Sequence, residues 1–355
     1  MLEKVDLTKK ISKEEYKAKM PQMEIELGRL QRECRELKIP VMIVFEGFGA
    51  SGKGVQIGKL IQSMDPRGFQ VFPIKAETED ERMHPFLWRF WTKTPEAGRI
   101  AIFDGSWYRK VLIDRFEKRT REKEIETAFH SIEAFEKQLT DGGTILVKLL
   151  LDIDQKEQKK RFEKLLEKKE TAWRVSQGDR ERNAKYSEYA AMMEEVLYRS
   201  DTKSAPWTVI EATDRRFATV KIYMTVIHAL AEAVEAVQRR RMEEQAIKAA
   251  EQVSGQQEAA EIMRQAGGEL EMLQSSVLSR ADLTLAYGKE EYEKAVNLAD
   301  HLFNNKFTDL SKKDIEELFG NEDIKEVEAN QNILDLVVAL GAASSKREAR
   351  EFISN

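Results

Sequence analysis

A glycine-rich loop constrains the fold of this chain more than any other feature: residues 47–54 read GFGASGKG. The loop follows an apolar run and precedes a helix-like stretch, VQIGKLIQSM. Glycines let the backbone turn its N–H groups inward, and a helix start attracts anions. This order predicts a phosphate-binding loop in which Lys53 reaches the terminal phosphates, against the alternative of a glycine-rich turn that binds nothing. The other expected phosphate-binding residues are Gly47, Gly49, Ala50, Ser51, Gly52 and Gly54.

Five runs of the sequence are rich in apolar and β-branched residues and predict the strands of one sheet. They are nearly continuous in apolar residues, as strands covered by helices on both faces are. Helix-length charged segments separate them, which favours right-handed crossovers and a parallel sheet of the α/β class. A helix is expected over residues 13–37, and one or two long helices over residues 215–265. The expected strands are Val41–Glu46, Phe69–Ile74, Ile100–Asp104, Thr144–Leu151 and Trp207–Ala212.

The composition narrows the classes of protein that fit. The chain has 355 residues, a formal net charge of −5 and one cysteine, Cys34. A disulfide framework and a cysteine-rich metal site are thereby excluded, and an anionic substrate needs a local basic site. The sequence shows no apolar run near the ~18–20 residues of a membrane span and no secretory signal at the N-terminus. We therefore expect a soluble cytoplasmic protein without a membrane partner.

The metal site is expected after the strand Ile100–Asp104. A carboxylate at this position can hold a Mg²⁺ ion that bridges phosphate oxygens, so Asp104 is predicted to be catalytic and the metal ligand. A turn role for this aspartate is the alternative. The residue after Lys53 is Gly54 rather than serine or threonine, so the hydroxyl that often assists the metal is missing there.

Cations elsewhere in the chain are candidates for binding phosphates. Arg89 lies between Trp88 and Trp91, and a guanidinium held by packed aromatic rings suits bidentate phosphate binding, so we predict a catalytic role for Arg89. Residues 159–174 predict one basic helix, which is either a solvated face or a lid that closes over phosphates. The further candidates for phosphate binding are Lys110, Lys168 and Arg174.

Residues 6–227 resemble the polyphosphate kinase 2 family. The resemblance rests on EGFGASGKG, FLWRFWTKTPEAGRIAIFDGSWY, KRFEKLLEKKETAWRVSQGD and SAPWTVIEATD, in this order. It implies a three-layer α/β/α P-loop kinase fold with a helical lid, and phosphoryl transfer between inorganic polyphosphate and a nucleotide with Mg²⁺. AMP as the acceptor is the first expectation, with ADP as the alternative. A homo-oligomer is also expected.

Two positions depart from the family's pattern. The family's glycine loop usually carries an aspartate where this chain has Gly49, and the family's FDRSWY carries an arginine where this chain has Gly105. Both missing residues are of the kinds that position metal ions or transferring phosphates. The alternative reading is therefore a partly degenerate domain that binds phosphate or dimerises without turnover, as one half of a tandem polyphosphate:AMP phosphotransferase.

The C-terminal part reads differently from the rest. Residues 280–296 repeat the pattern of residues 4–20, with DLT and KEEY at the same offsets, so we place a domain boundary between residues 280 and 281. Residues 281–355 are similar to the linker and truncated S4 domain of a bacterial tyrosyl-tRNA synthetase, as a natural fusion or a chimera. This helical appendage makes RNA contact by residues 332–355 an alternative function.

Overall fold

The computed structural model describes residues 2–251. The expected boundary at residue 280, the repeat at residues 280–296 and the synthetase-like segment 281–355 lie outside these residues and stay predictions. Along the chain, the named elements begin with a short 3₁₀ turn, η1 (Leu2–Lys4), and the long helix α1 (Lys13–Leu37).

One five-stranded sheet of parallel strands forms the centre of the domain, in the order β2-β3-β1-β4-β5. The predicted strands are confirmed to within one residue at each end. Their near-continuous burial in β1, β3 and β4 reflects helices on both faces. The strands are β1 (Val41–Gly47), β2 (Phe69–Pro73), β3 (Ile100–Asp104), β4 (Ile145–Asp152) and β5 (Trp207–Glu211).

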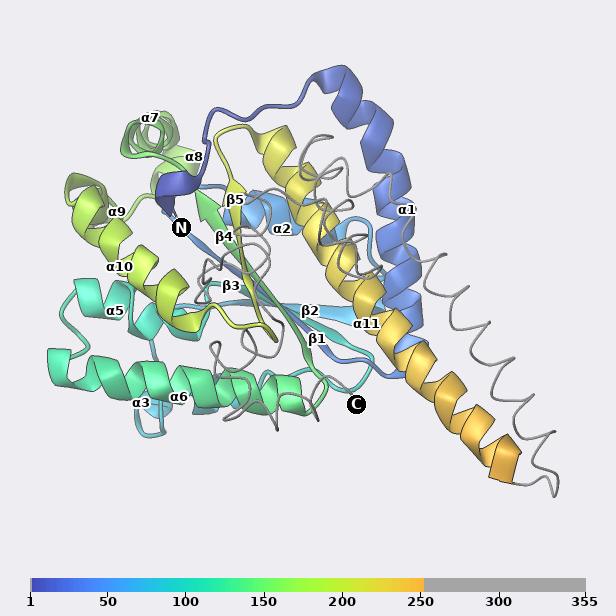
Figure 1. Ribbon diagram of the computed structural model, residues 1–355. Coiled ribbons are helices and arrows are strands. Elements are labelled where there is room, and N and C mark those ends of the chain that lie inside the picture. The colour runs from blue at the N-terminus through green and yellow to red at the C-terminus, as the bar shows by residue number, and fades with distance from the viewer. Residues whose placement is uncertain (1, 252–355) are drawn as a thin grey trace, which may run out of the picture. The chain divides into compact units, whose positions relative to one another are not determined.

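Two helical layers cover the sheet (Figure 1). Helix α11 (Arg215–Glu251) packs on β4 and β5 and against α1 and α2 (Lys53–Ile61). Helices α6 (Glu122–Asp141) and α10 (Tyr186–Ser200) lie on the opposite side, where α6 packs on β4. The shorter elements are η2 (Pro66–Gly68), α3 (Glu79–Arg82), α4 (Trp88–Trp91), η3 (Trp107–Lys110), α5 (Ile113–Phe116), α7 (Gln155–Leu166), α8 (Lys169–Ala172) and α9 (Gln177–Ala184).

Helix α11 corrects the expectation that no apolar run is long enough to span a membrane. Part of Arg215–Ala249 is long and apolar enough to do so by length and composition alone. In the structure 61% of that window is buried inside the protein, against α1 and the sheet. Its apolar character is therefore explained by its place in the core.

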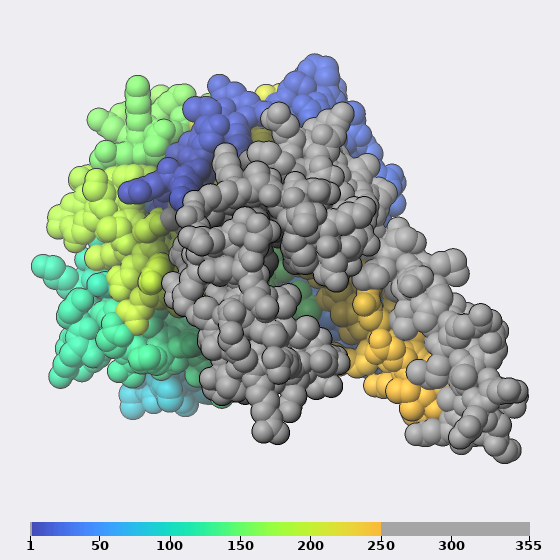
Figure 2. Space-filling model, viewed as in Figure 1, coloured from blue at the N-terminus to red at the C-terminus, as the bar shows by residue number. Residues whose placement is uncertain are grey.

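The N-terminal residues lie against the helices that follow β4. In the space-filling view the dark blue N-terminal segment contacts the green surface of these helices (Figure 2). The N–H of Leu2 donates a hydrogen bond of 2.7 Å to Glu194 in α10, and Lys9 forms an ion pair of 3.4 Å with Glu211 at the end of β5. The segment before α1 is therefore bonded to helix α10 and to the carboxyl end of strand β5.

The strand order makes β1 the strand at which the direction of winding reverses. In α/β sheets ligands bind outside the carboxyl ends of strands where the chain's direction of winding reverses. Strand β1 lies between β3 and β4, and its residue Phe45 is in register with Asp104 of β3. The glycine loop and Asp104 therefore leave the sheet side by side.

Candidate functional site

The glycine loop has the backbone that its sequence predicts. Gly47 has a φ of +134° and Gly52 has a φ of +108°, a region that glycine adopts at little cost. A Cβ on Gly47 would lie 2.2 Å from the carbonyl oxygen of Leu151 in the neighbouring strand β4. Only a glycine therefore fits at the point where β1 turns into the loop.

Side chains from helix α7 hold the loop through its carbonyl oxygens. Arg161 Nη1 donates to the carbonyl oxygens of Ala50 and Ser51 at 3.1 and 3.0 Å, while its Nη2 donates to those of Ala212 and Thr213 after β5. A second residue of α7, Gln158, donates from Nε2 to the carbonyl oxygen of Gly49 at 3.0 Å. The sequence analysis missed both residues, because their role depends on contacts across more than a hundred positions of the chain.

Lys53 lies over its own loop. Its Nζ is 2.9 Å from the carbonyl oxygen of Gly47 and 3.3 Å from that of Phe48. Phosphate oxygens are charged acceptors and bind an ammonium more strongly than neutral carbonyl oxygens do, so an anionic ligand can replace these contacts at the same place. The structure therefore places Lys53 at the mouth of the loop, as the sequence predicts.

The loop's donors are left for a ligand. Within residues 2–251 the N–H groups of Gly49, Ala50 and Gly52 donate no hydrogen bond, and the buried hydroxyl of Ser51 also has no partner there. Unpaired donors at a helix start form a site for an anion, because the helix dipole adds to their positive charge. The predicted phosphate-binding residues of the loop are thus brought together, with three N–H groups and one hydroxyl free, while the N–H of Ser51 donates to the carbonyl oxygen of Phe48.

Asp104 ends β3 beside the start of α2. Its side chain has no hydrogen bond or ion pair within the described part of the chain. A Cβ on Gly54 would lie 3.9 Å from its Oδ2, so the carboxylate stands next to the position where a serine or threonine hydroxyl is missing. Mg²⁺ is usually bound by one or two carboxylates, and its remaining ligands are water and phosphate oxygens. A single carboxylate beside a phosphate site therefore fits this ion.

Residues 2–251 contain no group of three or more His, Cys, Asp or Glu side chains that could hold a metal without a substrate. That finding fits Mg²⁺, which is usually held by one or two carboxylates together with substrate phosphates. The residues that surround the loop therefore fit a metal that arrives with a phosphorylated ligand.

Glu46 is a buried residue beside the glycine loop whose place could not be predicted from the sequence. It is buried at the end of β1, and its Oε1 accepts hydrogen bonds from the N–H and the hydroxyl of Ser106 at 2.7 and 2.8 Å. Burial raises the pKa of its carboxyl, an effect that the nearby ammonium of Lys53 opposes. Glu46 therefore fixes the segment after Asp104 to the strand that carries the glycine loop.

A narrow cavity with three cations lies beside this segment. Arg89, Arg109 and Lys110 line it together with Phe86 and two carboxylates, Glu77 and Asp114. Asp114 forms an ion pair of 3.3 Å with Arg109, and Lys110 lies over the ring of Phe86 at 5.8 Å. The structure thus brings the predicted residues Arg89 and Lys110 together and adds Arg109, which the sequence analysis missed.

Arg89 is held more tightly than the sequence suggests. Its guanidinium is buried, with Nη1 3.2 Å from the carbonyl oxygen of Lys75 and Nε 3.3 Å from Glu81, and it lies over the ring of Phe90. Trp91, expected to enclose it, is 40% exposed instead. A ligand that binds Arg89 therefore meets a guanidinium whose orientation is already fixed.

The prediction of one continuous basic helix over residues 159–174 is wrong, because the structure has two helices there. Helix α7 ends at Leu166 and α8 begins at Lys169, because Lys168 has an extended backbone and the hydroxyl of Thr171 donates to the carbonyl oxygen of Leu165 at 2.6 Å. The predicted ligands Lys168 and Arg174 are exposed on this segment and are not part of the cation cavity.

Helix α9 lies over the glycine loop at Gly49. A Cβ at this position would be 3.1 Å from Asp179 Oδ1 and 3.2 Å from Phe162 Cζ. Asp179 in turn accepts from Arg182 at 2.8 Å, and Arg182 donates to Glu117 of the segment after α5 at 2.7 Å. The carboxylate of Asp179 therefore occupies the space beside Gly49, where the family's aspartate would begin.

Gly105 follows Asp104 with a φ of +77°. A Cβ there would meet only Ile74, at 3.8 Å, so the space is open and the constraint is the left-handed backbone. The two departures from the family's pattern thus differ: Gly49 is crowded by other elements, whereas Gly105 is held by its own conformation.

Comparison with known proteins gives the same assignment for most of the described region. The model of the family described as Polyphosphate kinase 2 matches residues 10–240. A Polyphosphate:AMP phosphotransferase of Pseudomonas syringae pv. tomato is 36% identical over 233 residues, which are 66% of this chain and 47% of that protein. The chain therefore spans about half the length of this relative.

Two further relatives are covered over most of their length. An NDP-polyphosphate phosphotransferase 3 of Ruegeria pomeroyi is 31% identical over 61% of this chain and 72% of its own. The crystal structure of Polyphosphate Kinase 2 from Arthrobacter aurescens superposes with a TM-score of 0.62 at 30% identity, over 65% of this chain and 85% of that one.

Proposed function

Because the chain belongs to the polyphosphate kinase 2 family, we propose that it transfers a phosphoryl group between inorganic polyphosphate and an adenine nucleotide, with Mg²⁺. The observation that carries this proposal is the pairing of the free N–H groups of Gly49, Ala50 and Gly52 with the carboxylate of Asp104, none of which has a partner within residues 2–251. AMP is the first candidate acceptor, since the relative from Pseudomonas syringae is a Polyphosphate:AMP phosphotransferase, and ADP is the alternative.

The reaction exchanges one phosphorus–oxygen bond for another. An oxygen of the AMP phosphate attacks the terminal phosphorus of polyphosphate, a new P–O–P bond forms, and the bond to the next phosphate of the chain breaks. The products are ADP and a polyphosphate shorter by one unit, so no oxidant, reductant or water is required. Protein catalysis of such transfers consists mainly of positioning and of charge stabilisation in the transition state.

The residues of the site divide this work. The N–H groups of the glycine loop and the ammonium of Lys53 hold the phosphates near the reacting phosphorus. Asp104 would hold Mg²⁺, which neutralises charge on the phosphate oxygens when bound. Arg89, Arg109 and Lys110 surround the neighbouring cavity and would hold the phosphate of the partner substrate.

A coupled assay tests the proposal on the full chain. With polyphosphate, Mg²⁺ and AMP, and then ADP, we expect nucleotide phosphorylation that Lys53→Ala lowers by about 100-fold or more. The matched control is Lys59→Ala, an exposed lysine on the same helix. Absence of turnover above the level of the Lys53→Ala variant with both acceptors would reject the proposal.

A second candidate is a domain that binds phosphate or dimerises without turnover. Two observations favour it, both at positions where the chain departs from the family's pattern. Asp179 occupies the space next to Gly49, and Gly105 has a left-handed backbone. This candidate predicts nucleotide or polyphosphate binding by calorimetry without product. If loss of those two side chains is the cause, the double variant Gly49→Asp, Gly105→Arg gains activity, provided that its folding is retained; a folded, inactive double variant argues against this explanation.

A further inference from the structure

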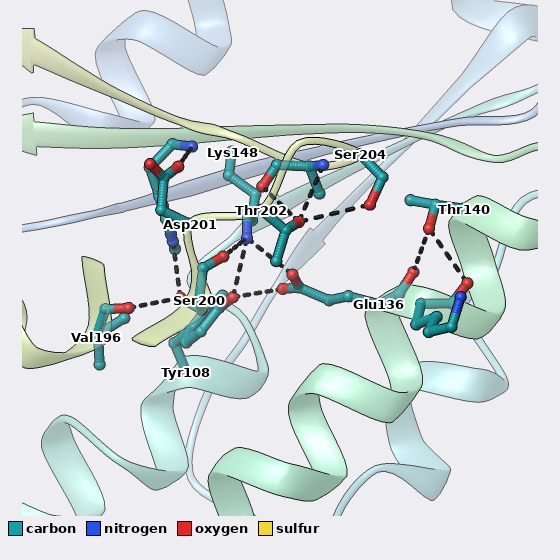
Figure 3. A network of polar contacts seen from close by, with 12 residues as sticks. Tyr108, Glu136, Thr140, Lys148, Val196, Ser200, Asp201, Thr202 and Ser204 are labelled. Carbon is teal, nitrogen blue, oxygen red and sulfur yellow. Dashed lines mark hydrogen bonds and ion pairs between the residues drawn. The ribbon is translucent and has the colours of Figure 1, made fainter. Parts of the chain in front are cut away.

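A buried polar cluster lies between β4 and helix α6 (Figure 3). Its centre is Lys148, a lysine with no exposed surface in the middle of β4. The ammonium donates to Glu136 Oε2 at 2.8 Å, to the carbonyl oxygen of Ser200 at 2.6 Å and to the hydroxyl of Tyr108 at 3.3 Å. Every donor of this buried cation therefore has an acceptor.

The second oxygen of Glu136 holds two consecutive residues of the segment after Asp104. Its Oε1 accepts from the indole Nε1 of Trp107 at 2.9 Å and from the hydroxyl of Tyr108. Burial raises the pKa of Tyr108 well above its ordinary value, so this hydroxyl stays a donor. One carboxylate on α6 thus fixes the orientation of both rings.

The buried ion pair of Lys148 and Glu136 is expected to contribute little to the free energy of unfolding. Moving a lysine and a glutamate out of water costs several kcal/mol each, and apolar residues of similar volume often replace such a pair without loss of stability. What apolar residues do not supply is direction, because each hydrogen bond here specifies where a donor and an acceptor lie. A role in orienting the bonded residues explains the arrangement better than a role in folding.

The oriented residues belong to the proposed site. Trp107 and Tyr108 lie between Ser106, which Glu46 holds, and the cavity residues Arg109 and Lys110. Segment 104–110 is therefore held at two places by buried carboxylates, Glu46 from β1 and Glu136 from α6. Its remaining side chains, Asp104 among them, extend from a backbone fixed on both sides.

Lys148 adds a connection to the end of helix α10. Ser200 is the last residue of α10, and its hydroxyl accepts from the indole Nε1 of Trp207 in β5 at 2.9 Å. The same ammonium thus bonds the end of α10 and, through Glu136, the segment that follows Asp104. A displacement of either region would therefore alter a hydrogen bond of the same buried ammonium.

We propose that Glu136 is a positioning residue for the phosphoryl transfer, one that holds Asp104 and Lys110 in place through Trp107 and Tyr108, and that Lys148 joins this segment to the end of α10. The inference rests on the proposed function. Neither residue touches the substrate; both act through the segment that does.

Three variants separate positioning from stability: Glu136→Leu, which removes the acceptor of both rings, Lys148→Met, and the double variant that carries both. Each single change leaves a buried group without its charged partner, so both lower the free energy of unfolding and the turnover number. The double variant removes both charges, and we expect its stability to recover while its turnover stays about tenfold or more below that of the unchanged protein. We also expect the Mg²⁺ concentration for half-maximal rate to rise several-fold.

The control is Glu133→Gln, an exposed residue one turn earlier on α6, which should change none of these quantities. A double variant whose turnover and Mg²⁺ requirement recover together with its stability would overturn the proposal. Tyr108→Phe, which removes one bond to Glu136 and keeps the ring, provides the same comparison if a charge variant fails to fold.

Hydrogen exchange supplies a readout that does not depend on turnover. The N–H groups of Gly105 and Ser106 are bonded to Phe45 and Glu46, so residues 104–110 should be protected in the unchanged protein. In the double variant we expect faster exchange in residues 104–110 and unchanged exchange in β1; equal protection in both proteins would contradict the proposal. An inactive unchanged protein with this exchange pattern would refute the proposed function and leave the positioning role intact.

Discussion

Two loops leave the carboxyl edge of the sheet side by side, and they are held in opposite ways. The glycine loop, residues 47–53, is fixed through its carbonyl oxygens by donors from Lys53, Gln158 and Arg161. The segment 104–110 is fixed through its donors by two buried carboxylates, Glu46 and Glu136. The glycine loop is therefore anchored mainly through its acceptors, and the segment 104–110 through the donors of Ser106, Trp107 and Tyr108.

The difference explains how adjacent loops can offer opposite charges to one ligand. Because its carbonyl oxygens are already bonded, the glycine loop presents N–H groups and an ammonium, which attract phosphate. In the second segment the donors of Ser106, Trp107 and Tyr108 bond to Glu46 and Glu136 rather than to Asp104. The carboxylate of Asp104 is thus left for a metal ion. Four changes test this complementarity, from the largest expected effect to the smallest.

Removal of the free carboxylate should have the largest effect on turnover. Asp104→Asn keeps the size of the side chain but loses the charge that would hold Mg²⁺, so we expect turnover to fall by about 100- to 1000-fold and the Mg²⁺ requirement to rise. Steady-state rates over a Mg²⁺ titration measure both. Asp141→Asn, at the exposed end of α6, is the matched control. An unchanged Mg²⁺ requirement in the Asp104 variant would show that Asp104 does not hold the metal, and would contradict the complementarity of the two loops.

Removal of the guanidinium that holds the glycine loop should lower stability most. Arg161→Met retains the apolar stem but leaves the carbonyl oxygens of Ala50, Ser51, Ala212 and Thr213 without their donor. We expect the free energy of unfolding to fall by about 3 kcal/mol in urea titrations. Lys160→Met, on the exposed side of the same helix, should change it by less than about 0.5 kcal/mol. Equal effects of the two substitutions would show that Arg161 does not hold the loop.

A third buried carboxylate provides a contrast with Glu46 and Glu136. Asp152 ends β4 beside the glycine loop, and burial, together with Asp154 and Glu211, raises its pKa from 3.8 to about 6. The folded state therefore keeps a proton that the unfolded chain releases, so this residue lowers the unfolding free energy as the pH rises from 3.8 to about 6.

Asp152→Asn should remove that decline and stabilise the protein at pH 7 by on the order of 2 kcal/mol. Urea titrations at pH 4, 5, 6 and 7 measure the change. If the unfolding free energies of the variant and of the unchanged protein change with pH in parallel, Asp152 is not the cause of the decline.

The smallest effect is expected where the two loops meet. Gly54→Ser places a hydroxyl near Asp104, since a Cβ there lies 3.9 Å from Oδ2. We expect Mg²⁺ to be needed at a concentration a few-fold lower than for Gly54→Ala, which adds the Cβ without the hydroxyl. Both variants should gain up to about 1 kcal/mol of stability, because glycine disfavours helix. Identical Mg²⁺ titrations of the serine and alanine variants would place the metal elsewhere.

Much of this arrangement could be predicted from the sequence where the cause is local. The glycine loop follows from strand, glycines and lysine within about fifteen positions, and the strands follow from their apolar runs. Asp104 could be predicted because it ends one of those runs. The family's motifs extended the prediction to the fold and to the helices that follow β4.

What the sequence could not predict depends on contacts between distant positions. Glu46 reads as the last residue of a strand, and Glu136 as one acid among many on a charged helix; only the fold brings them to Ser106 and Tyr108. The break between α7 and α8 was missed because residues 159–174 consist of good helix formers, and Thr171 ends the pattern through a side-chain bond to Leu165.

The most direct measurement is the electron density of the full chain bound to Mg²⁺ and either polyphosphate or ADP. We expect phosphate oxygens within hydrogen-bonding distance of the N–H groups of residues 49–54 and of Lys53 Nζ, with Mg²⁺ bound to Asp104. Density for the ligand at another place, with the glycine loop empty at saturating ligand, would contradict the account.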